Sequence, residues 1–192
     1  MTRATDEPDP IREQLLDAVE RLFYARGIQA VGMDEIRANC GLSLKRIYQL
    51  YPSKEHLVVA FLRRRDVRWR GQLAAHVERT EQPGRRILAV FDWLHRWFSD
   101  PDFRGCAWIN VYGELGATTP VVAAAVREHK QAFRRYLSRI LVEGGYPRSL
   151  TTAIYLLAEG AMVTAAIDGT PKAGIDARAA MVALLGTPKH PG

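Results

Sequence analysis

The chain has 192 residues, of which 47% are hydrophobic and 25% are charged, and its formal net charge is +6. This is the composition of a soluble globular protein with one or two domains and a substantial core. Its two cysteines are too few for a disulfide framework, and the sequence has no Gly-rich phosphate loop, metal-spaced His and Cys set or nucleophile motif. We therefore expect no enzymatic activity and no cofactor.

The first predicted helix follows a polar N-terminal segment. Asp9 is a good N-cap, and Pro10 suits the first helical position. An apolar stripe at helical spacing comes next, made up of Ile11, Leu15, Ala18, Val19, Leu22 and Phe23. Gly27 ends this helix, and residues 28–32 cross to the next one.

The stretch from residue 33 to residue 51 predicts two short helices joined by a tight turn. Gly41 suits a C-cap with positive φ, and Ser43 can N-cap the second helix through its hydroxyl. The second helix, residues 44–50, would expose a polar row made up of Lys45, Arg46, Tyr48 and Gln49. Such a row suits the DNA major groove, where cations meet phosphates and bidentate groups meet base edges. The alternative is an ordinary helical hairpin with a solvated second helix.

Positive charge is concentrated in one part of the chain. Residues 43–70 hold eight Lys and Arg against two Asp and Glu, whereas residues 1–42 hold five against eight. The excess begins at the second short helix, where a phosphate-binding surface would be needed. The alternative is a solvated face or a hinge to the second domain, and for the run from Arg63 to Arg65 we expect this alternative.

The rest of the chain predicts further helices. A long helix starts at Ser53 and runs to about Glu81. Later helices are predicted over residues 85–99, 105–115, 120–143, 149–168 and 175–185. Strand-like alternation is lacking, so we expect an all-α fold of about nine helices. The weakly charged run 150–167 indicates a buried or interfacial helix and not a membrane span. No signal-like segment opens the chain, so a cytoplasmic location is expected.

Taken together, residues 10–65 resemble the tetracycline-repressor (TetR) family of bacterial transcription regulators. The residues that carry the resemblance are Gly27, Met33-Asp34-Glu35-Ile36, Gly41-Leu42-Ser43, Ile47-Tyr48, Tyr51, Ser53-Lys54-Glu55 and Leu57. The family usually has Thr or Ser at the start of the helix after the crossing, where this chain has Val31-Gly32. The backbone N–H groups there can still bind a phosphate, but a hydroxyl contact is missing.

The resemblance implies a helix-turn-helix DNA-binding domain over residues 9–52 and a helical ligand-binding and dimerisation domain over residues 53–192. Residues 53–81 would bridge the two. The expected DNA contacts are Gly32, Met33, Ser43, Leu44, Lys45, Arg46, Tyr48, Gln49, Tyr51 and Lys54. Among them, Tyr48 and Lys54 are expected chiefly on phosphates.

A second segment, FRGCAWINVYGELG at residues 103–116, resembles part of the ligand-binding domain in one branch of the family. It implies a cavity for an apolar or aromatic effector, or a cationic one if a carboxylate faces it. The candidate lining residues are Phe91, Trp93, Trp97, Trp108, Tyr112, Glu114 and Glu159. The alternative is that these aromatic residues are plain core. Cys106 opens the short helix and is a conceivable redox site, but packing is the preferred interpretation.

The helices at residues 120–143 and 149–168 are rich in Ala, Val and other small or apolar residues. They suit a symmetric four-helix interface with a second copy, although the same faces could fill a monomer core. We therefore predict a homodimeric, ligand-responsive regulator, most simply a repressor, that binds a palindromic operator. Two rivals remain. One is a DNA-binding protein without a small-molecule input, and the other is a helical enzyme or binding module without DNA recognition.

Overall fold

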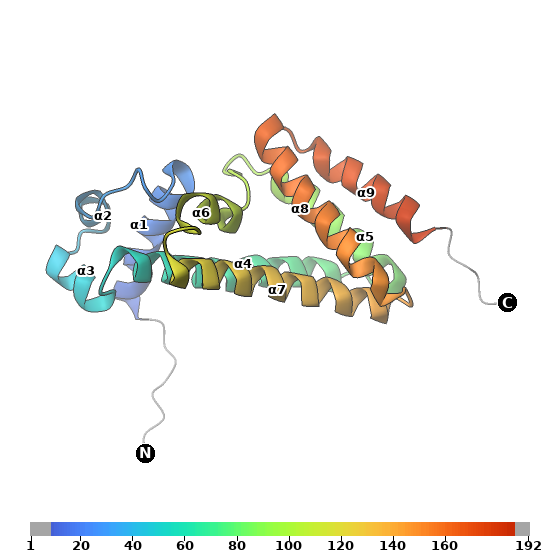
Figure 1. Cartoon of the computed structure of the whole chain (residues 1–192), viewed down its shortest axis with the longest axis horizontal. Coiled ribbons are helices and arrows are strands. Elements are labelled where there is room, and N and C mark those ends of the chain that lie inside the picture. The colour runs from blue at the N-terminus through green and yellow to red at the C-terminus, as the bar shows by residue number, and fades with distance from the viewer. Residues whose placement is uncertain (1–8, 187–192) are drawn as a thin grey trace, which may run out of the picture. The chain divides into compact units, whose positions relative to one another are not determined.

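The computed structural model describes residues 9–186, and over this range every regular element is helical (Figure 1). The α-helices are α1 (Pro10–Arg26), α2 (Met33–Cys40), α3 (Leu44–Leu50), α4 (Lys54–Glu78), α5 (Arg86–Phe98), α6 (Ala107–Leu115), α7 (Pro120–Glu143), α8 (Thr151–Asp168) and α9 (Lys172–Leu185). Two 3-10 turns, Pro83–Arg85 and Arg148–Leu150, precede α5 and α8. The all-α prediction is confirmed, although α4 ends earlier and α9 begins earlier than expected.

The chain divides into two compact units. The first contains the residues up to Arg65 together with Asn110–Val126, and the second contains Asp66–Ile109 and the residues from Arg127 onward. The first unit therefore includes the beginning of α4 and most of α6, besides the two short helices. The domain boundary expected after residue 52 remains a prediction.

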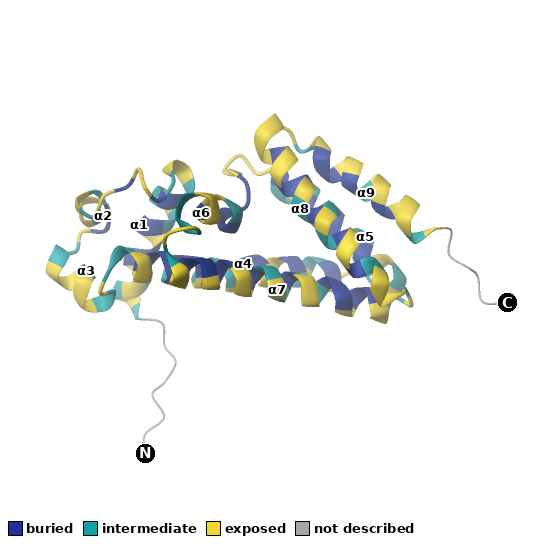
Figure 2. Ribbon diagram, viewed as in Figure 1, coloured by how far each residue is buried: buried dark blue, intermediate teal, exposed yellow. Residues whose placement is uncertain are grey.

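The core of the first unit is built by the apolar stripe of α1. Leu15, Val19 and Phe23 are buried, and the Phe23 ring meets Phe61 of α4 edge to face, with centroids 5.9 Å apart. Ile36 of α2 and Ile47 of α3 are fully buried. Figure 2 shows the buried residues along α1 and α4. In this core α2 packs on α1, and α3 packs on α2.

Basic residues of α4 add a polar connection to α1. Arg64 forms ion pairs with three carboxylates of α1, those of Glu13, Asp17 and Glu20. Arg65 pairs with Glu20 at 2.7 Å, and its guanidinium lies 3.8 Å from the centroid of the Tyr24 ring. The Arg64 and Arg65 side chains are only 12% and 14% exposed. The expected solvated face is therefore wrong for these two residues, which hold α4 to α1 instead.

In the second unit, α5 packs closely on α9. A Cβ atom added to Gly174 would lie 2.6 Å from the Cα atom of His95, so a side chain at this position would force the two helices apart. His95 also forms a 3.0 Å hydrogen bond between its Nδ1 atom and the carbonyl of Pro171, just before α9. These contacts fix the start of α9.

An apolar surface lies along α8 and α9. Several of its side chains are exposed, namely Leu156, Val163, Ile167, Ile175, Val182 and Leu184. By length and hydropathy, the segment Arg148–Asp168 could also cross a membrane, but one such helix is weak evidence for a span. Among the described residues, nothing covers this apolar face.

Candidate functional site

The turn between α2 and α3 has the geometry that its residues predict. Gly41 has φ +70°, in the left-handed region, and its N–H donates to the carbonyl of Arg37 at 3.1 Å. The Ser43 hydroxyl accepts a hydrogen bond from the N–H of Arg46 at 3.2 Å. The side chain of Gln14 in α1 donates to the carbonyl of Cys40 at 2.8 Å. Both ends of the turn are thus held, which fixes the angle at which α3 leaves it.

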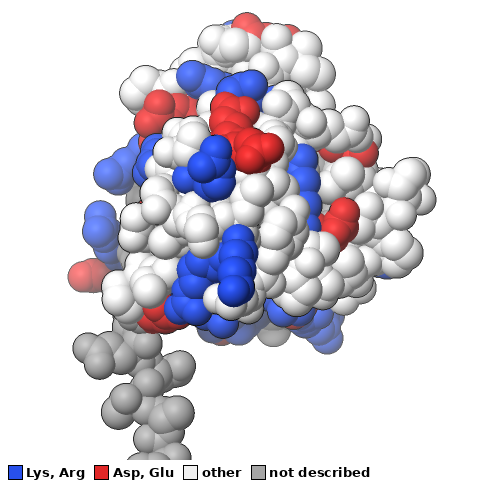
Figure 3. Space-filling view, turned by 90° about the vertical axis from the view of Figure 1, so that its left-hand side faces the viewer, with Lys and Arg blue, Asp and Glu red and all other residues white. Residues whose placement is uncertain are grey.

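This arrangement directs one side of α3 to solvent. Ile47 is fully buried and anchors the helix, while Lys45, Arg46, Tyr48 and Gln49 are exposed. Figure 3 shows the side of the molecule on which α2 and α3 lie and reveals a cluster of adjoining Lys and Arg side chains on that face. Cations and hydrogen-bonding groups on one exposed helix are the chemistry that contacts phosphates and base edges.

The start of α2 lacks a side-chain cap. Gly32 occupies the N-cap position in an extended conformation and makes no side-chain hydrogen bond, as the replacement of Thr or Ser by Gly requires. No side-chain hydroxyl therefore caps the first N–H groups of α2. A helix start of this kind can bind an anion through its backbone.

Lys54 occupies a more structural position than expected. Its Nζ atom donates to the carbonyls of Ile28 and Val31, at 2.7 and 2.6 Å. Burial lowers the pKa of Lys54, although the neighbouring carboxylates of Glu114 and Glu55 act in the opposite direction. Its ammonium holds the α1–α2 connection to the start of α4, and its contact with a DNA phosphate remains a prediction.

Glu114 lies against the same connection. Its two carboxylate oxygens accept the N–H groups of Ile28 and Gln29, at 3.0 and 2.8 Å. The Gln29 side chain donates in return to the carbonyl of Glu114 at 2.8 Å. Gly27 leaves room for this carboxylate, because a Cβ atom there would lie 3.0 Å from Oε1 of Glu114. We refer to this set of contacts, residues 27–29 with Glu114, as the Glu114 clamp.

The aromatic residues predicted for an effector cavity gather around Trp69 of α4, which the sequence analysis did not single out. Trp93, Trp97, Trp108, His129 and Phe133 all place their rings within 6.1 Å of the Trp69 ring, centroid to centroid. Most of this aromatic cluster is buried core. The indole N–H of Trp69 is nevertheless buried without an acceptor in the part of the chain described.

The predicted effector residues differ from one another in their surroundings. Trp93 and Trp97 line a surface pocket of about 490 Å³, which His76 and Asp100 also line. Phe91 is fully buried. Tyr112 is 49% exposed and, like Glu114, belongs to the first unit. The structure therefore brings only part of the predicted set together, because the side chains of α6 are divided between the two units.

Glu159 forms a buried polar group with Cys106 and Lys130. The Lys130 ammonium pairs with the Glu159 carboxylate and lies 3.4 Å from the Cys106 sulfur. Burial alone would lower the pKa of Lys130, but Cys106 and Glu159 together raise it. Cys106 is only 3% exposed. This burial agrees with a packing role for the thiol.

Comparison with known proteins finds a family match over part of the chain. A family model described as bacterial regulatory proteins, tetR family, matches residues 15–61, which contain α2, α3 and the turn. Residues 15–61 thus carry the sequence pattern of the TetR family. Proteins of this family act by binding DNA and not by catalysis, in agreement with the expectation that the chain is not an enzyme.

Sequence relatives match only part of this chain. The HTH-type transcriptional regulator Rv1255c of Mycobacterium tuberculosis H37Rv is 28% identical over 117 residues, 58% of this chain and 57% of that protein. The HTH-type transcriptional activator FasR of Mycolicibacterium smegmatis is 45% identical over 56 residues, 29% of this chain and 26% of that protein. The chain thus spans little more than half the length of Rv1255c.

Solved structures resemble the chain over nearly its whole length. SCO4454, a TetR-family transcriptional regulator from Streptomyces coelicolor, has a TM-score of 0.83 at 24% identity, covering 94% of this chain and 92% of that one. The reduced form of Escherichia coli NemR has a TM-score of 0.81 at 23% identity, covering 94% and 100%. At these identities the likeness shows the fold.

Proposed function

We propose that the protein is a homodimeric transcription repressor that binds a palindromic DNA operator and is released by a small molecule. The observation that carries the proposal is the exposed polar row of α3, held at a fixed angle by the capped turn. In this proposal Lys45, Arg46 and Gln49 contact base edges, and Tyr48 and Lys54 contact phosphates. Further contacts come from Gly32, Met33, Ser43, Leu44 and Tyr51.

Dimerisation is supported by the exposed apolar side chains of α8 and α9. Leu156 and Ile167 of α8 are 62% and 78% exposed, and Ile175 of α9 is 54% exposed. The exposed face of α7 is instead charged in its C-terminal half, with Arg134, Arg135 and Arg139 at its surface. We therefore place the interface on α8 with α9, and not on α7 with α8 as the sequence suggested. A helix-turn-helix protein reads a palindrome with two such copies.

The aromatic cluster supports an apolar or aromatic effector. The pocket beside Trp93 and Trp97 offers aromatic walls with nearby polar groups, which is how small-molecule sites are built. The unpaired indole N–H of Trp69 is a donor that a ligand acceptor could satisfy. In the proposed mechanism the effector favours a conformation in which the two recognition helices no longer match both half-sites. The protein would act in the cytoplasm, where its DNA lies.

The first test is binding of the purified protein to the DNA that flanks its own gene, with salt titrated and unrelated DNA as the competitor. We expect selective binding and a footprint that spans two half-sites. Lys45→Ala and Gln49→Ala should reduce the discrimination against altered operators by about 1–3 kcal/mol per base pair contacted. Arg21→Ala, at an exposed position of α1, is the control and should leave selectivity unchanged. Equal binding to every fragment would contradict the proposal. A promoter–reporter assay distinguishes repression from activation.

A further inference from the structure

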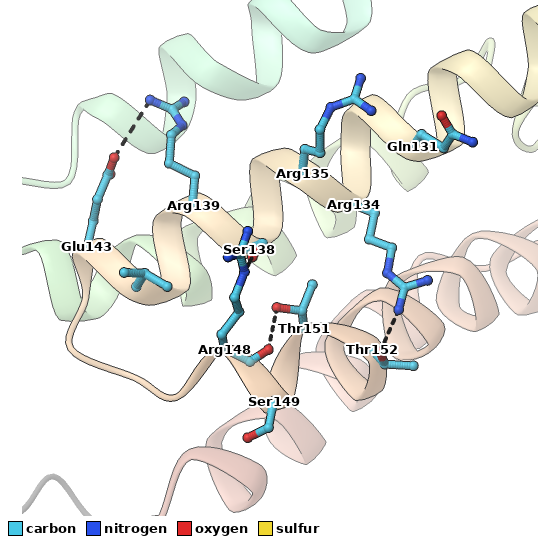
Figure 4. Close-up of a pocket in the computed structure, with 11 residues that line it drawn as sticks. Gln131, Arg134, Arg135, Ser138, Arg139, Glu143, Arg148, Ser149, Thr151 and Thr152 are labelled. Atoms are coloured by element: carbon cyan, nitrogen blue, oxygen red, sulfur yellow. Dashed lines mark hydrogen bonds and ion pairs between the residues drawn. The ribbon is translucent and has the colours of Figure 1, made fainter.

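A basic groove lies in the second unit, between the C-terminal half of α7 and the start of α8 (Figure 4). Its volume is about 880 Å³. Four arginines line it, namely Arg134, Arg135 and Arg139 of α7 and Arg148 of the turn before α8. The carboxylate of Glu143 is the one acidic group among its lining residues. The groove therefore carries an excess of positive charge that the proposed function does not use.

Neutral partners orient two of these arginines. An Nη atom of Arg134 donates to the Thr152 hydroxyl at 2.6 Å, and Nε of Arg148 donates to the Ser138 hydroxyl at 3.0 Å. Ser138 is only 8% exposed, so it is a fixed support for Arg148. Figure 4 shows Arg134 and Arg148 extending from α7 and from the turn before α8 toward the space between these elements. Because their partners are hydroxyls, the two guanidinium charges are held in place without being neutralised.

The single carboxylate compensates little of this charge. Glu143 lies 3.8 Å from Arg139 and 3.9 Å from Arg86, so it is shared between two weak contacts. Its side chain is 41% exposed, and surface pairs of this kind contribute little. Arg135 has no hydrogen bond or ion pair with the described residues, and in the view of Figure 4 its guanidinium extends to the other side of α7 from those of Arg134 and Arg148. The groove therefore presents uncompensated guanidinium groups to solvent.

We propose that this groove binds a small molecule that carries a di- or triphosphate group. Oriented guanidinium forks form paired, charge-assisted hydrogen bonds with phosphate oxygens. Hydroxyl groups of Ser149 and Thr152 lie in the same lining and can donate to further oxygens. A single phosphate would leave most of an 880 Å³ groove empty, whereas a nucleotide-sized anion matches a pocket of this volume. The exposed Val142 provides an apolar contact for the rest of such a ligand.

Calorimetric titration of the full chain tests this site, at about 0.15 M salt to suppress non-specific attraction. The probes are ATP, inorganic tripolyphosphate and sulfate. The double variant Arg134→Gln with Arg148→Gln should weaken ATP binding at least about tenfold, because it removes both oriented forks. The matched control is Arg21→Gln with Arg127→Gln, which removes the same charge at exposed positions outside the groove and should change the affinity by less than about twofold.

The outcomes separate the possible sources of the phosphate. ATP binding that tripolyphosphate reproduces supports the site and identifies the phosphate chain as the recognised group, whereas tighter binding of ATP supports a nucleotide. Equal losses in the two double variants, binding of sulfate as tight as that of ATP, or no binding to the unsubstituted protein would overturn the proposal. So would a non-operator DNA duplex that competes fully with ATP, because the groove would then be a DNA-backbone surface. Arg148→Lys, which keeps the charge and removes the fork, should weaken binding even if the double variant fails to fold.

Discussion

Glu114 shows how one side chain can hold a loop that has no regular structure. Its carboxylate accepts two consecutive backbone N–H groups, those of Ile28 and Gln29, just after α1 ends. A carboxylate in this position satisfies two donors at once and favours the turn that exposes them. The clamp therefore stabilises the path by which the chain reaches the recognition motif.

Glu114→Gln should lower the free energy of unfolding of the first unit by about 1–3 kcal/mol, because a neutral amide has one acceptor oxygen for two N–H donors. Urea unfolding followed by far-ultraviolet circular dichroism measures the change. Asp34→Asn, at a carboxylate that is 84% exposed, is the control. If the two variants unfold at the same urea concentration, the clamp contributes nothing measurable.

The same clamp predicts that Gly27 tolerates no side chain. Gly27→Ala would place a Cβ atom 3.0 Å from Oε1 of Glu114, at a residue whose φ is +86°. We expect a loss of stability of about 1–3 kcal/mol from the backbone conformation alone, because φ +86° with ψ 162° is a region that residues other than Gly rarely adopt. Gly32→Ala is the matched control, because Gly32 has an extended φ and no atom within 4 Å of an added Cβ. Equal melting temperatures of the two variants would rule out this account.

At the scale of whole elements, α4 and α7 are joined by a buried acid–base pair. Nδ1 of His129 in α7 lies 2.6 Å from a carboxylate oxygen of Asp66 in α4, and the His129 ring stacks on Trp108 with centroids 3.4 Å apart. Burial lowers the pKa of His129 more strongly than the Asp66 carboxylate raises it. Burial alone would raise the pKa of Asp66, but hydrogen bonds from His129 and Arg70 lower it to about 2. The pair is thus a neutral imidazole that donates to a carboxylate.

Acid should therefore destabilise the packing of α4 on α7. Below about pH 6.5 the unfolded chain binds a proton at His129 that the folded protein excludes, so the free energy of unfolding falls as the pH falls. The stabilisation from Asp66 is present above about pH 4 and is lost as the pH falls toward about 2. His129→Gln should reduce the pH dependence of urea unfolding between about pH 7.5 and pH 5.5, and His56→Gln, at an exposed residue, should not. An unchanged slope in His129→Gln would refute this assignment.

At the scale of the whole molecule, the apolar face of α8 and α9 is where we propose that two copies of the chain meet. Leu156→Lys places a charge on a side chain that is 62% exposed in one copy and would be buried between two. We expect the protein to become monomeric and to lose most of its operator affinity, since one half-site then binds alone. Sedimentation velocity measures the change in mass. Val142→Lys, at an exposed residue of α7, is the control and should leave the dimer intact. A monomeric Val142→Lys variant would instead place the interface on α7.

The sequence predicted the local features well because their signals are local. The caps at Asp9, Gly41 and Ser43 act within a few residues of themselves, and the exposed row of α3 follows from helical spacing. Contacts between distant segments were not predictable in the same way. Glu114 lies 85 residues from Gln29 in the chain, and no periodicity shows which N–H groups a carboxylate will meet.

Two further features were hidden for related reasons. Trp69 lies in a run of basic residues, so the sequence offered no sign that five other rings surround it. The helix α9 begins at Lys172, before the start that its apolar pattern predicted. The early start was missed because Gly174, which allows the close approach to α5, weakens the helical signal of the sequence.

Because of the aromatic cluster, tryptophan fluorescence follows the unfolding of one unit and not of the other. All four tryptophans, Trp69, Trp93, Trp97 and Trp108, belong to the second unit, whereas the recognition motif contains tyrosine and no tryptophan. Indole emission therefore records the second unit and is nearly blind to the DNA-binding helices. If emission and circular dichroism give different midpoints in urea, the two units melt separately and no single unfolding free energy describes the chain. Coincident midpoints would mean that the two units unfold together.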